Sequence, residues 1–143
     1  MKTRRNKLDI AFSQLIRERA GWTCESCGKY HPEGARRSLH CSHFFSRRNR
    51  STRWDSQNAA AHCFACHQYL GENPLLFTDW VKAHLGQTGY ELLRLRAGKP
   101  RKFSKPELED MHQEMKAQLA HMEALRSSGE AGRIEFDLMM EVA

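Results

Sequence analysis

The chain has 143 residues, 40% of them hydrophobic, and a formal net charge of +6. This length suffices for one domain with a modest core, and no apolar run approaches the roughly 18 residues of a membrane span, so we expect a soluble protein. The charge is unevenly distributed: residues 1–106 carry 20 Lys and Arg against 8 Asp and Glu, whereas residues 107–143 carry 3 against 9. We therefore expect the first part, and not the last, to bind a polyanion.

The N-terminal half predicts a helix, two strands and a second helix. Residues 1–6 are polar and basic and are interpreted as a frayed arm. Apolar residues at helical spacing predict a helix over residues 7–20. Strands are predicted over 38–45 and near 58–62, and the next helix runs from about residue 63 to residue 71.

The C-terminal half predicts helices and linkers only. Asn73-Pro74 starts a helix over 75–85, Gly86 ends it, and a shorter helix follows over 88–97. Ser104 caps a long helix over about 105–127. We expect its apolar stripe to pack back on the same domain, with a homodimer seam as the alternative: Leu108, Met111, Met115, Leu119, Met122 and Leu125. Residues 133–142 form an acidic amphipathic tail without an assigned role.

Four of the five cysteines stand at spacings typical of a metal site. Cys24/Cys27 and Cys63/Cys66 form two Cys-x-x-Cys pairs, which suit one tetrahedral structural Zn²⁺ with no open position. Disulfides are the weaker alternative, because no secretory signal precedes them, and we infer a reducing, cytoplasmic setting. Cys41 is the odd thiol, expected to be buried and inert.

Three residues around the second pair carry the predicted chemistry. Asn58 lies fifteen residues after His43, and His67 lies nine further, directly after Cys66. This pattern resembles the HNH nuclease signature. The resemblance implies that His43 is the general base, that His67 binds a catalytic Mg²⁺ or another divalent cation, and that Asn58 holds the loop by hydrogen bonds. Where many HNH sequences have Asp before the base, this chain has Ser42, so we expect the cation to rest on His67, water and phosphate oxygens with Ser42 or His40 assisting.

Four further segments resemble the phage Rap/NinG recombination endonucleases: residues 12–19, 42–44, 52–55 and 70–74. The resemblance implies a structure-selective endonuclease that acts on branched DNA such as Holliday junctions and D-loops, encoded by a phage or prophage and active in the bacterial cytoplasm. The expected fold is α+β, mostly α. A zinc-stapled ββα-metal (HNH) module with flanking helices would occupy residues 1–98, and a basic linker, long helix and acidic tail would occupy 99–143.

Two groups of cations are predicted to contact DNA. No acidic residue lies between Glu33 and Asp55, where the first group stands: Arg36, Arg37, Arg47, Arg48, Arg50 and Arg53. These arginines would clamp the backbone near the cut, or anchor phosphates without a catalytic share. The linker supplies a second backbone contact through Lys99, Arg101 and Lys102.

Other readings remain open. The chain is alternatively a non-catalytic zinc-stapled DNA-binding or packaging accessory protein, or an HNH partner that nicks DNA for a phage packaging motor. Among the other side chains, His62 is expected in a turn, His31 and His84 at the surface, and Trp54 as an anchor in the core or loop, with stacking on an unpaired base as its alternative role.

Overall fold

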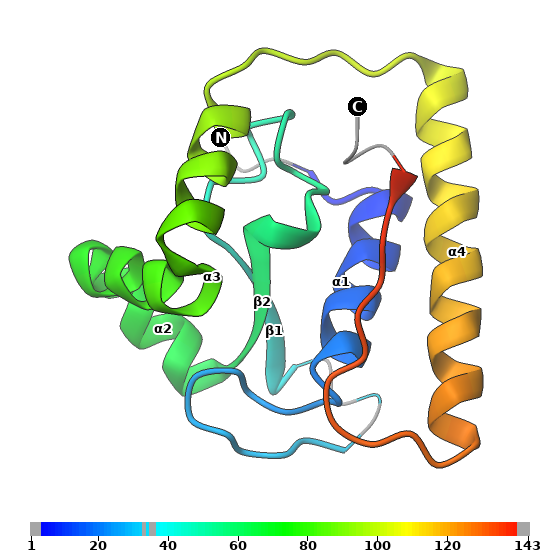
Figure 1. Ribbon diagram of the computed structural model, residues 1–143, viewed down its shortest axis with the longest axis horizontal. Coiled ribbons are helices and arrows are strands. Elements are labelled where there is room, and N and C mark those ends of the chain that lie inside the picture. The colour runs from blue at the N-terminus through cyan, green and yellow to red at the C-terminus, as the bar shows by residue number, and fades with distance from the viewer. Residues whose placement is uncertain (1–3, 33, 35–36, 140–143) are drawn as a thin grey trace.

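A computed structural model describes residues 4–32, 34 and 37–139 of the chain (Figure 1). It is α+β and mostly helical, as predicted. Its elements are α1 (Lys7–Arg19), β1 (Leu39–His43), the 3₁₀ turn η1 (Ser56–Asn58), β2 (Ala59–Cys63), α2 (Phe64–Glu72), α3 (Pro74–Ala97) and α4 (Lys105–Ser127). No helix in these described ranges is both long enough and apolar enough to cross a membrane.

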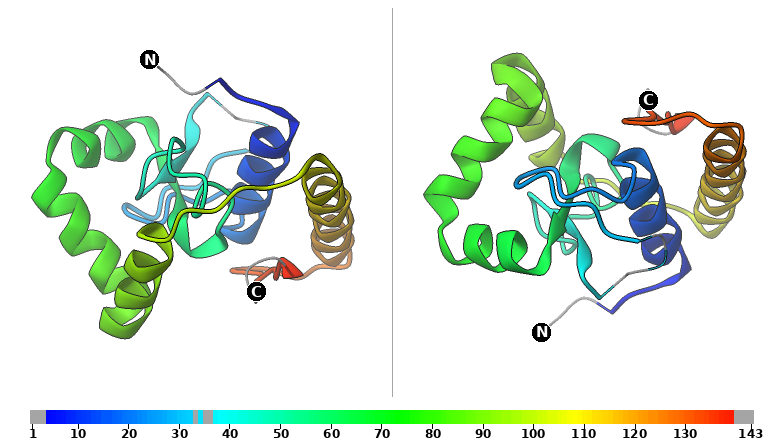
Figure 2. Two further views of the ribbon diagram at one scale, coloured as in Figure 1. Left: turned by 90° about the horizontal axis from the view of Figure 1, so that it is seen from above. Right: turned by 90° about the horizontal axis from the view of Figure 1, so that it is seen from below.

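The two strands form the centre of the molecule. They pair antiparallel, with Leu39 opposite Cys63 and His43 opposite Ala59. Helix α1 covers one side of this ribbon, while α2 and α3 cover the other (Figures 1 and 2). The order β1, loop, β2, α2 is the predicted one, and the antiparallel pairing places the start of β1 beside the start of α2.

Helix α1 begins at a capping box. The Asn6 side chain accepts a hydrogen bond from the Asp9 backbone N–H, and the Asp9 carboxylate accepts one from the Asn6 backbone N–H. These bonds satisfy backbone donors that a helix start leaves unpaired. Phe12, Leu15 and Ile16 of α1 are fully buried. The helix contacts both strands and also α4, so core packing holds it between them.

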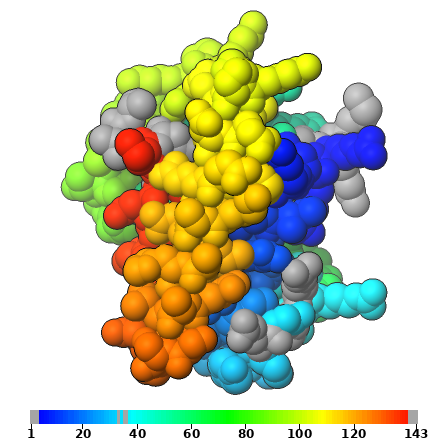
Figure 3. Space-filling view, turned by 90° about the vertical axis from the view of Figure 1, so that its right-hand side faces the viewer, coloured from blue at the N-terminus to red at the C-terminus, as the bar shows by residue number. Residues whose placement is uncertain are grey.

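Helix α4 packs along α1 and extends the same core. Met111, Met115 and Met122 are buried with the α1 side chains, and Figure 3 shows α4 running along one face of the molecule beside α1. The apolar stripe is therefore covered within one chain, as the preferred sequence interpretation predicted. The proposed homodimer seam is occupied by the chain's own α1 and tail. The core is continuous across the predicted boundary at residues 98 and 99.

The acidic tail has a structural role that the sequence analysis did not assign. Ile134, Phe136 and Leu138 alternate with exposed residues and are buried in the core. The Ile134 backbone N–H donates to the Arg19 carbonyl at 3.0 Å, and the Arg19 guanidinium lies over the Phe136 ring. The extended tail thus packs into the core that α1 and α4 share. The predicted residues 140–142 of the tail lie outside the described residues.

Helix α3 is bent at Gly86, which has φ 78° and ψ 161°. This conformation favours glycine, and it confirms the predicted break between two helices. The second half of α3 reaches the arginine-rich loop between the strands. There the Arg96 side chain forms an ion pair with Asp55 at 2.6 Å, and Asn49 Nδ2 donates to the Ala97 carbonyl at 2.8 Å.

Candidate functional site

The four predicted zinc ligands are brought together. Their sulfur atoms all lie within 4.8 Å of one another, and Cys27 Sγ lies 3.8 Å from Cys63 Sγ. A tetrahedral ion with Zn–S bonds of about 2.3 Å requires sulfur separations of about 3.8 Å. Each knuckle is shaped for such an ion, because the backbone N–H of its second cysteine points at the sulfur of its first. The cluster can therefore hold a zinc ion.

The thiols of this cluster differ in how readily they lose a proton. Burial and the neighbouring side chain of Cys63 raise the pKa of Cys66 to about 12. A bound cation would stabilise the thiolates that such crowding otherwise opposes. An ion bound here would tie the first knuckle, after α1, to the junction of β2 and α2. It would thereby fix the start of the helix that carries His67.

His43 lies at the end of β1 and has one nitrogen fixed by the backbone. Its Nε2 donates to the Arg53 carbonyl at 3.2 Å, and its ring packs against Phe12. Burial lowers the pKa of His43 to about 4. The side chain is therefore neutral near pH 7, with an unprotonated Nδ1 that is able to accept a proton.

Asn58 holds the loop beside His43 in the way that the sequence predicted. Its Nδ2 donates to the carbonyls of Phe45 and Thr52, each at 2.9 Å, and its Oδ1 accepts from the Phe45 backbone N–H at 2.8 Å. Asn58 is fully buried. One side chain thus joins the end of β1 to the far side of the arginine-rich loop, including the segment whose carbonyl fixes His43.

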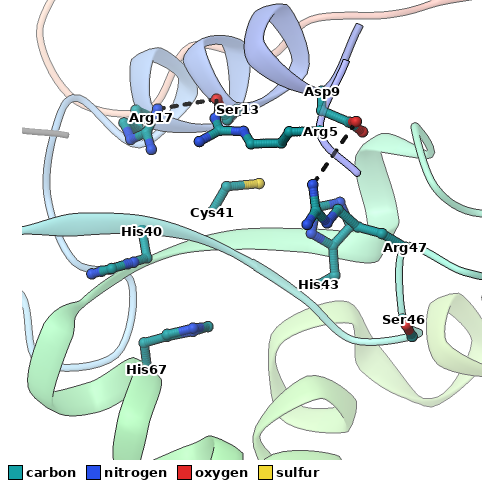
Figure 4. A pocket seen from close by; sticks show the side chains of 10 residues that line it. All are labelled: Arg5, Asp9, Ser13, Arg17, His40, Cys41, His43, Ser46, Arg47 and His67. Atoms are coloured by element: carbon teal, nitrogen blue, oxygen red, sulfur yellow. Dashed lines mark hydrogen bonds and ion pairs between the residues drawn. The ribbon is translucent and has the colours of Figure 1, made fainter. Parts of the chain in front are cut away.

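His43 and His67 line one cavity of about 400 Å³, which lies along β1 between α1 and α2 (Figure 4). Figure 4 shows His43 and Cys41 directed toward α1, while His40 and His67 lie on the opposite side of the strand. The remaining lining comes mainly from α1 and its flanks and includes Arg5, Asp9, Ser13, Arg17, Ser46 and Arg47. The two predicted catalytic histidines are therefore brought to one positively charged space.

Cys41 also lines this cavity rather than lying wholly inside the core. Burial raises its pKa to about 12, so its thiol is protonated and unreactive near neutral pH. The prediction of an inert thiol agrees with this environment.

Ser42 and the neighbouring histidines are connected behind the cavity wall. Ser42 is fully buried and does not line the cavity. Its Oγ lies 2.6 Å from His67 Nδ1 and 2.9 Å from His62 Nδ1. His40 stacks on His67 with ring centroids 5.0 Å apart. These contacts favour an indirect role for Ser42 over the direct cation contact that the sequence suggested.

Several side chains differ from their expected surroundings. His62 is a fully buried residue of β2, so its placement in a turn was wrong. His31 is buried beside Ser38, and His84 stacks half-buried on Trp80, so neither lies fully at the surface.

Trp54 anchors the core. Its Nε1 donates to Asp9 Oδ1 at 3.0 Å, and its ring packs against Phe103. Because Trp54 is buried, its placement favours the anchor interpretation over stacking on an unpaired base.

The predicted DNA-binding arginines of the loop fall into different environments. Arg53 is buried, where it donates to both oxygens of Asp9, at 2.9 and 2.5 Å. Its guanidinium therefore serves the fold rather than an exposed surface. Arg47 lines the cavity, Arg37, Arg48 and Arg50 are exposed, and Arg36 lies outside the described residues. In the linker, Lys99 and Lys102 are exposed and Arg101 lies over the Phe103 ring.

Sequence reasoning missed the contribution of α1 to the cavity. Asp9, Ser13 and Arg17 recur at intervals of four residues and all line the cavity, although each is buried. A row of polar residues on an otherwise apolar helix face was the available signal, because burial of such groups requires partners or a function. Asp9 itself is saturated by Arg53, Trp54 and the helix cap, which leaves the cavity with a surplus of cations.

The comparisons bear on the identity of the chain. A family model described as Bacteriophage Lambda NinG protein matches residues 2–125. The chain belongs to the NinG family. The match spans the cysteine cluster, the cavity and nearly all of α4, and it confirms the resemblance to NinG that the sequence motifs indicated. Comparisons with curated proteins and with solved structures gave no significant match.

Proposed function

We propose that this NinG-family protein is a metal-dependent DNA endonuclease of the HNH type. The observation that carries the proposal is the shared cavity: His43 and His67 approach it from the two sides of β1, beside Arg5, Arg17 and Arg47. A strand histidine and a helix histidine beside a cationic space large enough for a phosphodiester suit phosphodiester hydrolysis.

His43 would act as the general base. Its Nε2–H is engaged by the Arg53 carbonyl, so the lone pair lies on Nδ1. In this arrangement Nδ1 takes a proton from the attacking water, and the fixed ring keeps that nitrogen in one direction. The arginines of the cavity would bind the phosphate and offset the negative charge that develops during attack.

His67 would hold a divalent cation, which would polarise the scissile phosphate and stabilise the leaving oxygen. Within the described residues, the only cluster of three or more His, Cys, Asp or Glu side chains suited to a metal is the cysteine cluster. Asp9, the carboxylate of the cavity, is already saturated by its partners. His67 would therefore supply the main protein ligand, with water and phosphate oxygens completing the coordination.

The proposed substrate is branched DNA, such as a Holliday junction or a D-loop. The resemblance to the Rap/NinG recombination endonucleases supports this choice. Exposed cations in two separate segments, residues 48–50 and 99–102, would contact more than one DNA arm.

A cleavage assay tests the proposal. The zinc-loaded protein is incubated with labelled four-way junction, D-loop and plain duplex, with EDTA, Mg²⁺ or Mn²⁺. We expect metal-dependent cleavage that favours the branched substrates. His43→Ala should lose roughly 10²-fold or more of the rate while its DNA affinity is unchanged. His121→Ala, an exposed histidine of α4, is the matched control with an unchanged rate.

A non-catalytic DNA-binding or packaging accessory protein is the second candidate. The observation that favours it is the lack of an unpaired carboxylate among the described residues that line the cavity. The hypothesis of a non-catalytic accessory protein predicts that wild type and His43→Ala bind all three DNAs equally well and cleave none of them with any metal. A packaging nickase would instead cut duplex as readily as branched DNA.

A further inference from the structure

Three side chains form a hydrogen-bonded row on the side of the sheet that faces α2: His67 of α2, Ser42 of β1 and His62 of β2. Ser42 Oγ is 2.6 Å from His67 Nδ1 and 2.9 Å from His62 Nδ1. Both Ser42 and His62 are 0% exposed, so water does not replace either contact. Of the three residues, His67 alone lines the cavity.

A proton count restricts this row. Donation by both Nδ1–H groups to Oγ would leave the buried Ser42 hydroxyl hydrogen without either histidine as its acceptor. With both imidazoles neutral, the favoured arrangements are therefore those in which one Nδ1 accepts this hydrogen and the other Nδ1 donates to Oγ. In the first arrangement His67 Nδ1–H donates to Ser42 and the His67 lone pair lies on Nε2. In the second arrangement the Ser42 hydroxyl donates to His67, and Nε2 of His67 carries the proton.

We propose that Ser42 and His62 are positioning residues that hold His67 in the first arrangement, with an unprotonated Nε2 available to a cation in the cavity. This inference rests on the proposed function, because a metal-binding histidine donates its other ring N–H to a neighbouring acceptor. Ser42 is that acceptor. His62 is also required, because its Nδ1 accepts the hydrogen bond from the Ser42 hydroxyl, which then cannot donate to His67.

The surroundings of His62 suit this arrangement. Its proton then lies on Nε2, which is buried and has no hydrogen-bond partner within the described part of the chain. The His62 ring packs edge-to-face with Trp80 at 4.5 Å and with Phe77 at 6.2 Å. An N–H can make weak favourable contacts with the π-electrons of neighbouring aromatic rings, whereas a lone pair cannot.

His40 restrains the same ring from its other side. The two imidazoles are stacked at 5.0 Å with an interplanar angle of 5°, so rotation of His67 would disrupt the stack. Orientation and tautomer of His67 are thus set by different neighbours. Ser42 acts through His67, so its role requires no contact with the cavity.

Nitrogen NMR of the zinc-loaded, ¹⁵N-histidine-labelled protein tests the proposal. Two-bond proton–nitrogen correlations distinguish the two neutral tautomers, and His67→Gln assigns the signals. We expect Nδ1–H for His67 in the wild type and in Ser42→Thr, which retains the hydroxyl. In His62→Phe the Ser42 proton has His67 as its remaining partner, so His67 should change to Nε2–H.

Two results would overturn the inference: an Nε2–H His67 in the wild type, or an unchanged His67 tautomer in a folded His62→Phe variant. The wild-type spectrum decides the matter even when that variant does not fold. Broadening of the His67 signals by Mn²⁺ gives a second readout, and His62→Phe should need at least tenfold more Mn²⁺ than the His121→Ala control. Equal Mn²⁺ requirements would also count against the positioning role.

The same experiments separate this inference from the proposed function. If His67 has the Nδ1–H tautomer but the protein cleaves no DNA, the positioning role of Ser42 and His62 is supported and the nuclease proposal fails. If the protein cleaves branched DNA while His67 has the Nε2–H tautomer, the nuclease proposal is supported and the positioning role fails.

Discussion

Replacing Arg53 with methionine should destabilise the protein strongly. The change removes the nearer of two cationic partners of Asp9, since Arg47 Nη1 also lies 3.9 Å from Asp9 Oδ2, while it keeps a long apolar side chain. Arg53 is 7% exposed and Asp9 is 4% exposed, and the guanidinium donates to both carboxylate oxygens. Loss of one member of a buried pair costs about 3–5 kcal/mol of unfolding free energy. The hydrogen bonds that Asp9 keeps from Trp54 and Asn6 place the expected loss near the lower end, about 3 kcal/mol.

Urea unfolding of the zinc-loaded protein measures this loss. Arg50→Met makes the same substitution at an exposed position of the same loop and should change the unfolding free energy by about 0.5 kcal/mol or less. The double variant Asp9→Asn/Arg53→Met should lose less than the sum of the two single variants, because no unpaired charge remains. A loss below about 1 kcal/mol in Arg53→Met would refute the reasoning that the pair is buried and coupled.

The same pair predicts a dependence on acid. Burial opposes ionisation of Asp9, but hydrogen bonds and charge from Arg53 outweigh it and lower the pKa of Asp9 below its ordinary 3.8. The folded state therefore binds the proton less readily than the unfolded state. The stability from this group is fully present above the ordinary carboxyl pKa and is lost as pH falls through the lowered value. Arg53→Met should lack this acid-dependent component.

Four further perturbations follow from the structure. Cys63→Ser should reduce zinc retention at least tenfold and remove the cooperative unfolding transition, measured by metal content and circular dichroism, and full zinc retention would contradict the ligand set. Asn58→Ala should lower the unfolding free energy by roughly 2–4 kcal/mol, because two carbonyls and one N–H lose their partner, and a change under about 0.5 kcal/mol in urea would count against the bracing role. Burial lowers the pKa of His43 to about 4. Because the unfolded state then binds the proton more readily, stability should fall as pH falls from about 6.5 toward 4. The cleavage rate should show no His43-dependent decline near pH 6.5, and a decline there that follows the His43 imidazole by NMR would refute the burial argument. Phe136→Ala should cost about 3–5 kcal/mol if the tail belongs to the core, whereas an exposed tail would give no measurable change.

The predictable part of the fold was the part that depends on local spacing. Pro74 and Ser104 gave two helix starts correctly, and Gly86 marked the bend in α3, because caps and glycine conformations are decided within a few residues. The two Cys-x-x-Cys pairs also predicted that their four sulfur atoms converge, since binding to one tetrahedral ion requires short distances between the sulfurs. The convergence of the cysteines and the order of the strands were therefore accessible without a structure.

The rest depended on contacts between distant residues. Arg53 looked like its exposed neighbours Arg48 and Arg50, and only the approach of Asp9 from α1, 44 positions away, distinguishes it. The tail was likewise unreadable, because its alternating apolar residues acquire meaning only beside α1 and α4. Sequence reasoning placed both catalytic candidates at the cavity but missed the helix that forms its other wall.

The bend at Gly86 has a consequence for how related chains can diverge. An added Cβ there would meet no atom within 4 Å, so the bend depends on the backbone conformation of one residue rather than on packing. That conformation sets where Arg96 reaches Asp55, and so where the loop with Arg48 and Arg50 is held. Evolution can therefore change the direction of this arginine-rich loop through substitutions in a distant helix, while every residue that lines the cavity stays the same.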